Sequence, residues 1–217
     1  MKKLRIGVDI DNVLRAFAAY SVEKWNEQFP DKPTLSTDMW SDHAWCYKLF
    51  SGQTARERRA KCFDWWIKEG IYENAPALQG AQDALFSLSQ RQRHKIVIIS
   101  HQTREAHPEA ALVTTKWLYK HNIYFDELHY VSDKSVVAAD ILIDDNPNII
   151  ENFLNRGVSD PAYAIMFEFP WNDKHEFQIR SNRNKLVFVM SDEEKYYWPN
   201  TVDLVRQITS RRIYGHQ

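Results

Sequence analysis

The chain has 217 residues and a mass of 25.7 kDa, which fits one large domain or one domain with a small insertion. Its 44% hydrophobic and 26% charged residues are an ordinary globular composition that argues against disorder. The formal net charge of −1 provides no basic field for duplex nucleic acid, and no apolar run approaches the roughly 20 residues of a membrane span. Cys46 and Cys62 are too few for a disulfide framework or a four-cysteine zinc site. We therefore predict a soluble, cytoplasmic protein that binds neither duplex nucleic acid nor a membrane.

Short apolar runs rich in β-branched residues predict strands that are buried on both faces, as in a parallel sheet; they are Leu4–Ile10, Lys95–Ile99, Leu128–Val131 and Ile141–Ile143. Helical patterns lie between them, over Gly80–Gln90 and Pro108–His121, and a further helix follows Pro147 and is closed by Gly157. This alternation predicts an α/β fold with a doubly wound, Rossmann-like parallel sheet.

The segment between the first two strands is too long for an ordinary connection. It has helical patterns over Ala16–Gln28 and Thr54–Lys68 and is dense in aromatic residues, which are Trp25, Trp40, Trp45, Phe63, Trp65 and Trp66. We interpret residues 17–78 as a small helical cap inserted after strand one, with residues 1–16 and 79–217 forming the α/β core. Beyond Gly157 we expect an edge strand at Tyr163–Phe167, a strand at Leu186–Met190 and a final helix around Thr201–Arg211.

Polar residues follow each predicted strand of the core. They are Asp9, Asp11 and Asn12 after the first strand, Ser100 and His101 after the second, Asp133 and Lys134 after the third, and Asp144 and Asp145 after the fourth. Ligands of open α/β sheets bind beyond the carboxyl ends of the strands, so these side chains are expected to meet. Each cluster alone is also a common turn or helix-cap sequence, and their order after buried runs favours a site.

Carboxylates that converge in this way cannot all stay ionised without a cation. Aspartate oxygens favour a hard ion such as Mg²⁺, which also binds substrate phosphate. Together with Lys134 and the Ser100 hydroxyl, the metal would admit a phosphoryl group. One aspartate could then attack phosphorus while a second protonates the leaving oxygen.

These residues resemble the motifs of the haloacid dehalogenase-like (HAD) phosphohydrolase superfamily. The first motif is similar to Ile6–Leu14, the second to Ile98–Ser100, the third to Lys134 and the fourth to Ile141–Asp145. This superfamily places its helical cap after the first motif. More specifically, Asp133–Asp145 and Phe17 resemble the 5′(3′)-deoxyribonucleotidase family.

The resemblance implies a role for each matching residue. Asp9 would be the nucleophile that forms an aspartyl-phosphate and a ligand of Mg²⁺. Asp11 would be the general acid and base, and its backbone carbonyl would bind the metal. Ser100 and Lys134 would bind the phosphoryl group. The remaining assignments are Asp145 as the third metal ligand with Asp144 as its alternative, and Phe17 and Tyr72 as contacts of the nucleobase.

The chain also departs from the family pattern. Asn12 stands where the family has glycine, and asparagine tolerates the left-handed backbone best among the other residues. His101 replaces a small hydroxyl residue and could donate a hydrogen bond to phosphate or be structural. The family's additional phosphate-binding lysine has no exact counterpart, with Lys116 and Arg104 as candidates. The basic cluster Arg56–Lys61 is interpreted as a solvated helix face that could also steer an anionic substrate.

The expected activity is that of a Mg²⁺-dependent phosphatase, a 5′-nucleotidase acting on nucleoside monophosphates and foremost on deoxyribonucleotides. The alternatives are a phosphatase for another small phosphomonoester or a nucleic-acid 3′-phosphate, and a catalytically silent nucleotide-binding relative. The sequence leaves the oligomeric state open, with a homodimer among the options.

Overall fold

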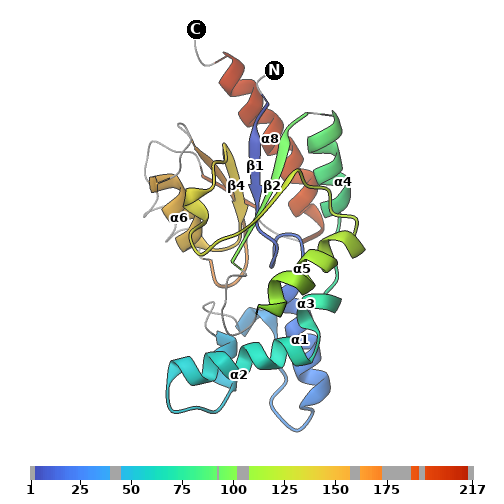
Figure 1. Ribbon diagram of the computed structural model, residues 1–217, viewed down its shortest axis with the longest axis vertical. Coiled ribbons are helices and arrows are strands. Elements are labelled where there is room, and N and C mark those ends of the chain that lie inside the picture. Colours follow the sequence, from blue (N-terminus) through green and yellow to red (C-terminus); the bar gives the residue numbers. More distant parts are fainter. Residues whose placement is uncertain are drawn as a thin grey trace.

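The computed structural model describes residues 3–39, 45–91, 93–101, 108–156, 162–172, 187–190 and 194–214. A parallel sheet forms its centre, with the strand order β3-β2-β1-β4-β5-β6 (Figure 1). The strands are β1 (Arg5–Val8), β2 (Lys95–Ser100), β3 (Glu127–Tyr130), β4 (Ile141–Asp144), β5 (Tyr163–Phe167) and β6 (Val187–Met190). The order reverses at β1, which pairs with β2 on one side and β4 on the other. The predicted doubly wound α/β fold is confirmed.

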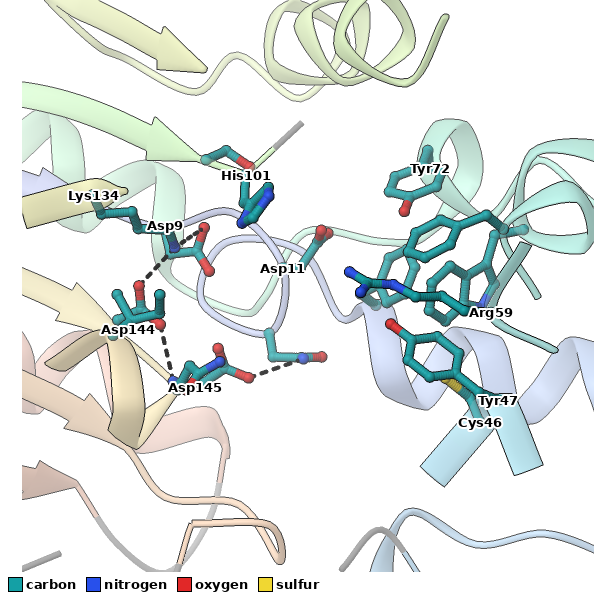
Figure 2. A pocket seen from close by; sticks show the side chains of 17 residues that line it. Asp9, Asp11, Cys46, Tyr47, Arg59, Tyr72, His101, Lys134, Asp144 and Asp145 are labelled. Atoms are coloured by element: carbon teal, nitrogen blue, oxygen red, sulfur yellow. Dashed lines mark hydrogen bonds and ion pairs between the residues drawn. The ribbon is translucent and has the colours of Figure 1, made fainter. Parts of the chain in front are cut away.

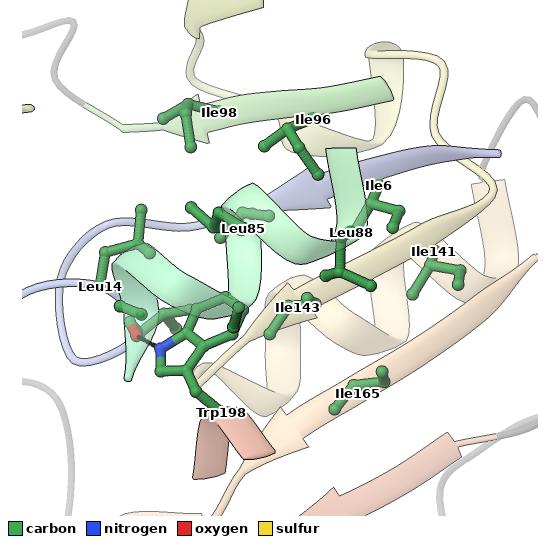
Figure 3. Close-up of a cluster of buried hydrophobic side chains, with 14 of the residues drawn as sticks. Ile6, Leu14, Leu85, Leu88, Ile96, Ile98, Ile141, Ile143, Ile165 and Trp198 are labelled. Carbon is green, nitrogen blue, oxygen red and sulfur yellow. Dashed lines mark hydrogen bonds between the residues drawn. The ribbon is translucent and has the colours of Figure 1, made fainter. Parts of the chain in front are cut away.

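Successive strand residues point to opposite faces of the sheet, and helices cover both faces. On one face, α4 (Ala81–Phe86) and α8 (Glu194–Tyr214) cover a cluster that includes Ile6, Leu85, Ile96, Ile98, Ile141, Ile143 and Trp198 (Figure 3). On the other face, Ile150 and Phe153 of α6 (Pro147–Arg156) pack in one cluster with Val97, Ile99 and Leu142 of the sheet. This two-sided burial is the physical reason for the uninterrupted apolar runs in the strand sequences.

Helix α5 (Glu109–Lys120) lies beside the sheet and reaches the segment inserted after β1. Its Trp117 and Leu118 belong to the first core cluster, and the helix also packs against α3 (Ile71–Asn74). A single π-helical turn, η3 (Ser87–Arg91), continues α4, and the short 3₁₀ turn η4 (Lys134–Val136) follows β3. Turn η3 leads into the amino end of β2, whereas η4 lies beyond the carboxyl end of β3 and carries Lys134.

Helices between β1 and β2 form a lobe beyond the carboxyl ends of the strands (Figure 1). The lobe contains α1 (Phe17–Gln28), η1 (Thr37–Met39), η2 (Trp45–Leu49), α2 (Ala55–Lys68) and α3. Helix α2 begins with a capping box, in which the Thr54 side chain accepts from the Glu57 N–H and Glu57 accepts from the Thr54 N–H. The lobe buries its own aromatic cluster, made of Phe17, Trp25, Cys46, Cys62, Phe63, Trp65, Trp66, Ile71 and Tyr72. We call it the helical lobe.

Several boundaries differ from the sequence prediction. Strand β1 ends at Val8, because the chain turns at Ile10, whose carbonyl accepts from the N–H groups of Val13, Leu14 and Arg15. The final helix begins at Glu194 rather than near Thr201 and contains Pro199 in its interior. Predictions that concern Trp40, Arg104 and Gly157 lie outside the described residues, and so does the side chain of Trp45.

Candidate active site

The carboxyl ends of β1, β2 and β4 open onto a cavity of about 270 Å³ that lies between the sheet and the helical lobe. Its sheet side is lined by Asp9, Asp11, Asn12, Ser100, His101, Lys134, Asp144 and Asp145, and its lobe side by Phe17, Tyr47, Arg59, Phe63, Trp66 and Tyr72 (Figure 2). The structure therefore brings the polar residues that follow four separate runs of sequence to one place, as the strand-end argument predicts.

Lys134 is the buried cation of the sheet side. Its Nζ lies 2.8 Å from Asp9 Oδ1 and 2.7 Å from Asp144 Oδ2, and its side chain is only 4% exposed. Burial alone would lower the pKa of Lys134, but the carboxylates of Asp144 and Asp9 outweigh it and hold that pKa above its ordinary value. Lys134 therefore stays protonated and keeps the carboxylate of Asp9 in place.

Asp9, Asp144 and Asp145 form a buried acidic cluster, in which one carboxylate oxygen from each residue lies within 4.8 Å of the others. Burial, together with repulsion from Asp9 and opposed by Lys134, raises the pKa of Asp144 to about 6. Burial and the neighbouring carboxylates also raise the pKa of Asp145 well above its ordinary value. A divalent cation would stabilise the ionised form of these buried carboxyl groups, and carboxylate oxygens are hard ligands. These residues therefore fit a metal such as Mg²⁺.

The two adjacent aspartates have different partners. The Asp144 carboxylate accepts hydrogen bonds from Lys134 Nζ at 2.7 Å and from the Asn146 N–H at 2.9 Å. The Asp145 carboxylate accepts from Asn12 Nδ2 at 3.1 Å, and its backbone carbonyl accepts from Asn172 Nδ2 at 2.7 Å. Asp144 is thus committed to the lysine, whereas Asp145 presents its carboxylate beside Asn12.

Asn12 shapes the loop between β1 and α1. Its φ of 62° is left-handed, a conformation that asparagine tolerates better than other non-glycine residues. Its amide also makes contacts that glycine cannot provide, because Nδ2 donates to Asp145 and Oδ1 accepts from the Ala18 N–H at 2.8 Å. Asn12 therefore links the acidic cluster to the first turn of the lobe.

Asp11 points from the same loop into the cavity and is bound by Arg15, a residue that the sequence analysis missed. Arg15 Nε and Nη2 lie 2.8 Å and 2.6 Å from Asp11 Oδ1. Burial raises the pKa of Asp11, and the Arg15 guanidinium opposes that shift. The signal in the sequence was an arginine four residues after Asp11, within the otherwise apolar stretch Val13–Phe17.

The lobe side of the cavity is an aromatic wall. Phe17 lies 4.9 Å from Trp66 and 5.0 Å from Tyr72 between ring centroids, and both Phe17 and Tyr72 are more than nine-tenths buried. Arg59 from α2 extends over Tyr47 and Phe63, with its Cζ 5.6 Å and 5.8 Å from the two ring centroids (Figure 2). The wall is therefore both the core of the lobe and a surface of the cavity.

Other candidates are divided between the cavity and the rest of the molecule. Ser100 is buried at the end of β2, and the exposed His101 follows it; both line the cavity. Lys116 is exposed on α5 and does not line the cavity. Within the basic cluster Arg56–Lys61, Arg59 lines it. In the described ranges, no helix combines the length and apolarity needed to cross a membrane.

A parallel sheet that reverses at β1, an acidic cluster with a lysine at its carboxyl edge, and helices inserted after β1 together define an α/β protein with the haloacid dehalogenase-like fold. A solved haloacid dehalogenase-like protein from Agrobacterium tumefaciens shares this fold, with a TM-score of 0.58 and 11% identity over 94% of this chain and 100% of its own. The chain belongs to the family described as 5′ nucleotidase, deoxy (pyrimidine), cytosolic type C protein, whose model matches residues 2–190.

Curated relatives agree with this family. A Chlorobaculum tepidum protein provisionally named 5′(3′)-deoxyribonucleotidase is 27% identical over 162 residues, which are 70% of this chain and 75% of the relative. The mitochondrial 5′(3′)-deoxyribonucleotidase of Mus musculus is 25% identical over 150 residues, which are 68% and 67% of the two chains. The protein is thus a phosphoric monoester hydrolase, a nucleotidase with a haloacid dehalogenase-like fold.

Proposed function

We propose that the protein is a Mg²⁺-dependent 5′-nucleotidase that hydrolyses nucleoside monophosphates, foremost deoxyribonucleotides, through an aspartyl-phosphate on Asp9. The observation that carries this proposal is the buried contact of Asp9 with Lys134, which lies in the acidic cluster and opposite an aromatic wall. The family and the names of the curated relatives support the nucleotide as substrate class.

The ligands of the metal would be the carboxylates of Asp9 and Asp145 and the backbone carbonyl of Asp11. Asp144 is the poorer candidate for a direct ligand because both of its carboxylate oxygens already accept hydrogen bonds, Oδ2 from Lys134 and Oδ1 from the Asn146 N–H. Bound Mg²⁺ would supply positive charge that offsets repulsion between the substrate phosphate and the carboxylates.

In the proposed reaction, the Asp9 carboxylate attacks phosphorus and the bond between phosphorus and the ester oxygen breaks. Asp11 gives its proton to the departing ester oxygen. Lys134 and the Ser100 hydroxyl hold the phosphoryl oxygens as charge develops on them. Asp11 then takes a proton from water, which attacks the aspartyl-phosphate, releases inorganic phosphate and restores Asp9.

The aromatic wall supports a nucleobase at the other end of the substrate. Phe17 and Tyr72 present ring surface to the cavity, and stacking of a base on an aromatic ring contributes about 1–3 kcal/mol with little dependence on the base. The helical lobe stands over the cavity as a cap, which favours a mononucleotide over a polymer, and Arg59 would attract the anionic substrate. A cytoplasmic location and a homodimer stay predictions.

The test is phosphate release from a panel of phosphomonoesters that compares deoxyribonucleotides with ribonucleotides, 5′ with 3′ phosphates, and different bases. We expect turnover with Mg²⁺, loss of turnover with EDTA, and preference for deoxyribonucleoside 5′-monophosphates. The variant Asp9→Asn should abolish turnover while remaining folded, because it removes the nucleophile and keeps the side-chain shape. Asp31→Asn, at an exposed residue of the lobe, is the matched control and should retain full activity. Turnover by Asp9→Asn comparable to the control would refute the mechanism.

A further inference from the structure

We propose that Arg15 is a positioning residue for proton transfer: it fixes the orientation of the Asp11 carboxyl group from which the leaving oxygen of the substrate receives its proton. This inference rests on the proposed function and adds a residue to it that none of the sequence motifs includes.

The first argument is the burial of Arg15. Its side chain is 0% exposed, and arginine is almost never fully buried unless its charge is paired. Asp11 supplies this pairing from four residues earlier, with Nε at 2.8 Å and Nη2 at 2.6 Å from the same atom, Oδ1. The loop also joins the two residues through its backbone, in an isolated bridge between Asp11 and Arg15. The charge pair is therefore part of the folded loop and not a surface contact.

The second argument is that the guanidinium is fixed from three directions. Nη1 donates to the Tyr72 carbonyl of α3 at 2.6 Å, and Nη2 lies 3.4 Å from Thr114 Oγ1 of α5. Its Cζ also lies 5.7 Å, 5.1 Å and 5.2 Å from the ring centroids of Phe17, Tyr72 and Trp117. A planar guanidinium held by these contacts cannot turn without breaking several of them, so the direction of Asp11 is fixed as well.

The third argument is the geometry at Asp11. Nε and Nη2 of Arg15 both engage Asp11 Oδ1, so the carboxylate is held on the side that faces Arg15. Figure 2 shows Asp11 between the Asp9 cluster and the aromatic wall, which is where the ester oxygen of a substrate spanning the two ends would lie. A guanidinium has only hydrogen-bond donors and no acceptor, so Arg15 can orient Asp11 without accepting the transferred proton. Because Tyr72 and Phe17 also contact Arg15, the same residue links the acid to the base-binding wall.

If Arg15 were purely structural, it would only fill space and satisfy the Tyr72 carbonyl. The dependence of kcat/KM on the leaving group separates this role from the positioning of Asp11. p-Nitrophenolate leaves as a stable anion and needs little help from an acid, whereas phenolate needs a proton. The experiment measures kcat/KM, which covers the steps up to the aspartyl-phosphate, for a series of aryl phosphates from p-nitrophenyl to phenyl phosphate. These substrates carry no nucleobase, so changes in base binding do not enter.

We expect Arg15→Met to lose about 10²-fold in kcat/KM with phenyl phosphate and less than about tenfold with p-nitrophenyl phosphate, because general acids contribute about 10²–10⁴-fold. Asp11→Asn should likewise make kcat/KM depend more steeply on the leaving group. Combining it with Arg15→Met should not increase that dependence further. Arg15→Lys, which keeps a charge near Asp11, should restore part of the loss with phenyl phosphate.

Arg5→Met is the matched control. Arg5 also forms an arginine–carboxylate pair, with Glu127 at 3.0 Å and 2.8 Å, but at the other end of β1 and away from the cavity. This variant should leave the leaving-group dependence unchanged. Circular dichroism and thermal melts verify folding. If Arg15→Met does not fold, the dependence of kcat/KM on the leaving group is measured for Arg15→Lys instead.

Equal losses with all aryl phosphates, or no loss, in a folded Arg15 variant would overturn the positioning role while leaving the proposed function intact. Absence of turnover by the wild-type protein with every phosphomonoester would instead remove the proposed function.

Discussion

The two ends of the cavity are held together by different interactions, paired buried charges at the sheet end and aromatic packing at the lobe end. At the sheet end, Asp9, Lys134, Asp144 and Asp145 are all at least nine-tenths buried, and each carboxylate or ammonium needs a partner that its neighbours supply. At the lobe end, the centroids of neighbouring aromatic rings lie 4.7–6.3 Å apart. Such contacts would form a hydrophobic core even without a ligand. Buried charges tolerate few arrangements, whereas aromatic packing tolerates many. We therefore expect the sheet end to determine the chemistry and the lobe end to determine which substrates bind.

Replacement of Lys134 gives the largest effect that this comparison predicts. Lys134→Met removes the cation between Asp9 and Asp144, so kcat/KM should fall about 10³-fold, the upper range for loss of one transition-state donor. Leaving two buried carboxylates without their cation should also lower the free energy of unfolding by about 3–5 kcal/mol in the absence of metal.

Steady-state kinetics and urea denaturation measure the two quantities. Lys24→Met is the control, since Lys24 makes an exposed ion pair with Glu27 on α1. This variant should change kcat/KM and the free energy of unfolding only slightly. Wild-type activity in a folded Lys134→Met protein would contradict a role of the sheet end in phosphoryl transfer.

The acidic cluster should make stabilisation by Mg²⁺ depend on pH. Burial and mutual repulsion raise the pKa of Asp144 to about 6 and raise that of Asp145 as well. The folded state then binds more protons than the unfolded state, so these carboxyls cost stability as pH rises from about 4 through about 6. Metal ligands must be ionised, so the same rise in pH strengthens Mg²⁺ binding.

At a Mg²⁺ concentration of about 100 times its Kd, the free energy of unfolding should increase by about 2.7 kcal/mol at about pH 8. The increase should be much smaller at about pH 5, where the carboxyls are protonated. Thermal melts with and without MgCl₂ provide the measurement. Asp145→Asn should abolish the effect, whereas Asp203→Asn, at an exposed residue of α8, should preserve it; equal shifts at both pH values would count against a metal at this cluster.

The lobe end should show a smaller and substrate-dependent effect. Phe17→Leu keeps an apolar side chain in the lobe core but removes the ring, so KM for nucleoside monophosphates should rise about tenfold, within the range of one base stack. KM for phenyl phosphate should change little. Phe29→Leu removes a ring that packs on Trp25 and does not line the cavity, and it serves as the control. Equal changes for both substrates would assign Phe17 to packing alone.

The sheet end was largely predictable from sequence because parallel strands buried on both faces place their carboxyl ends together. Asp9, Ser100, Lys134 and the pair Asp144–Asp145 all follow from that rule. The preference for Asp145 over Asp144 as a metal ligand stays a prediction and does not follow from that rule, because it depends on the folded contacts of each carboxylate, such as that of Asp144 with Lys134.

Arg15 escaped prediction for a similar reason: its partners include Tyr72 and Thr114, which lie far away in sequence on α3 and α5. The start of the final helix was missed because Pro199 indicates a helix boundary. In the folded chain, Trp198 beside this proline is fully buried, and tertiary packing of that kind outweighs local propensity.

The contact between α8 and the loop after β1 has a consequence for biosynthesis. Trp198 Nε1 donates a hydrogen bond of 2.9 Å to the carbonyl of Val13, across 185 positions of sequence (Figure 3). The ribosome synthesises β1 and its loop early, yet the indole that satisfies this buried carbonyl is made only after all of the described strands. A nascent chain that ends before residue 198 would contain every aspartate of the cluster but would lack the hydrogen bond from Trp198 to its loop. We therefore expect enzymatic activity to develop only late in translation.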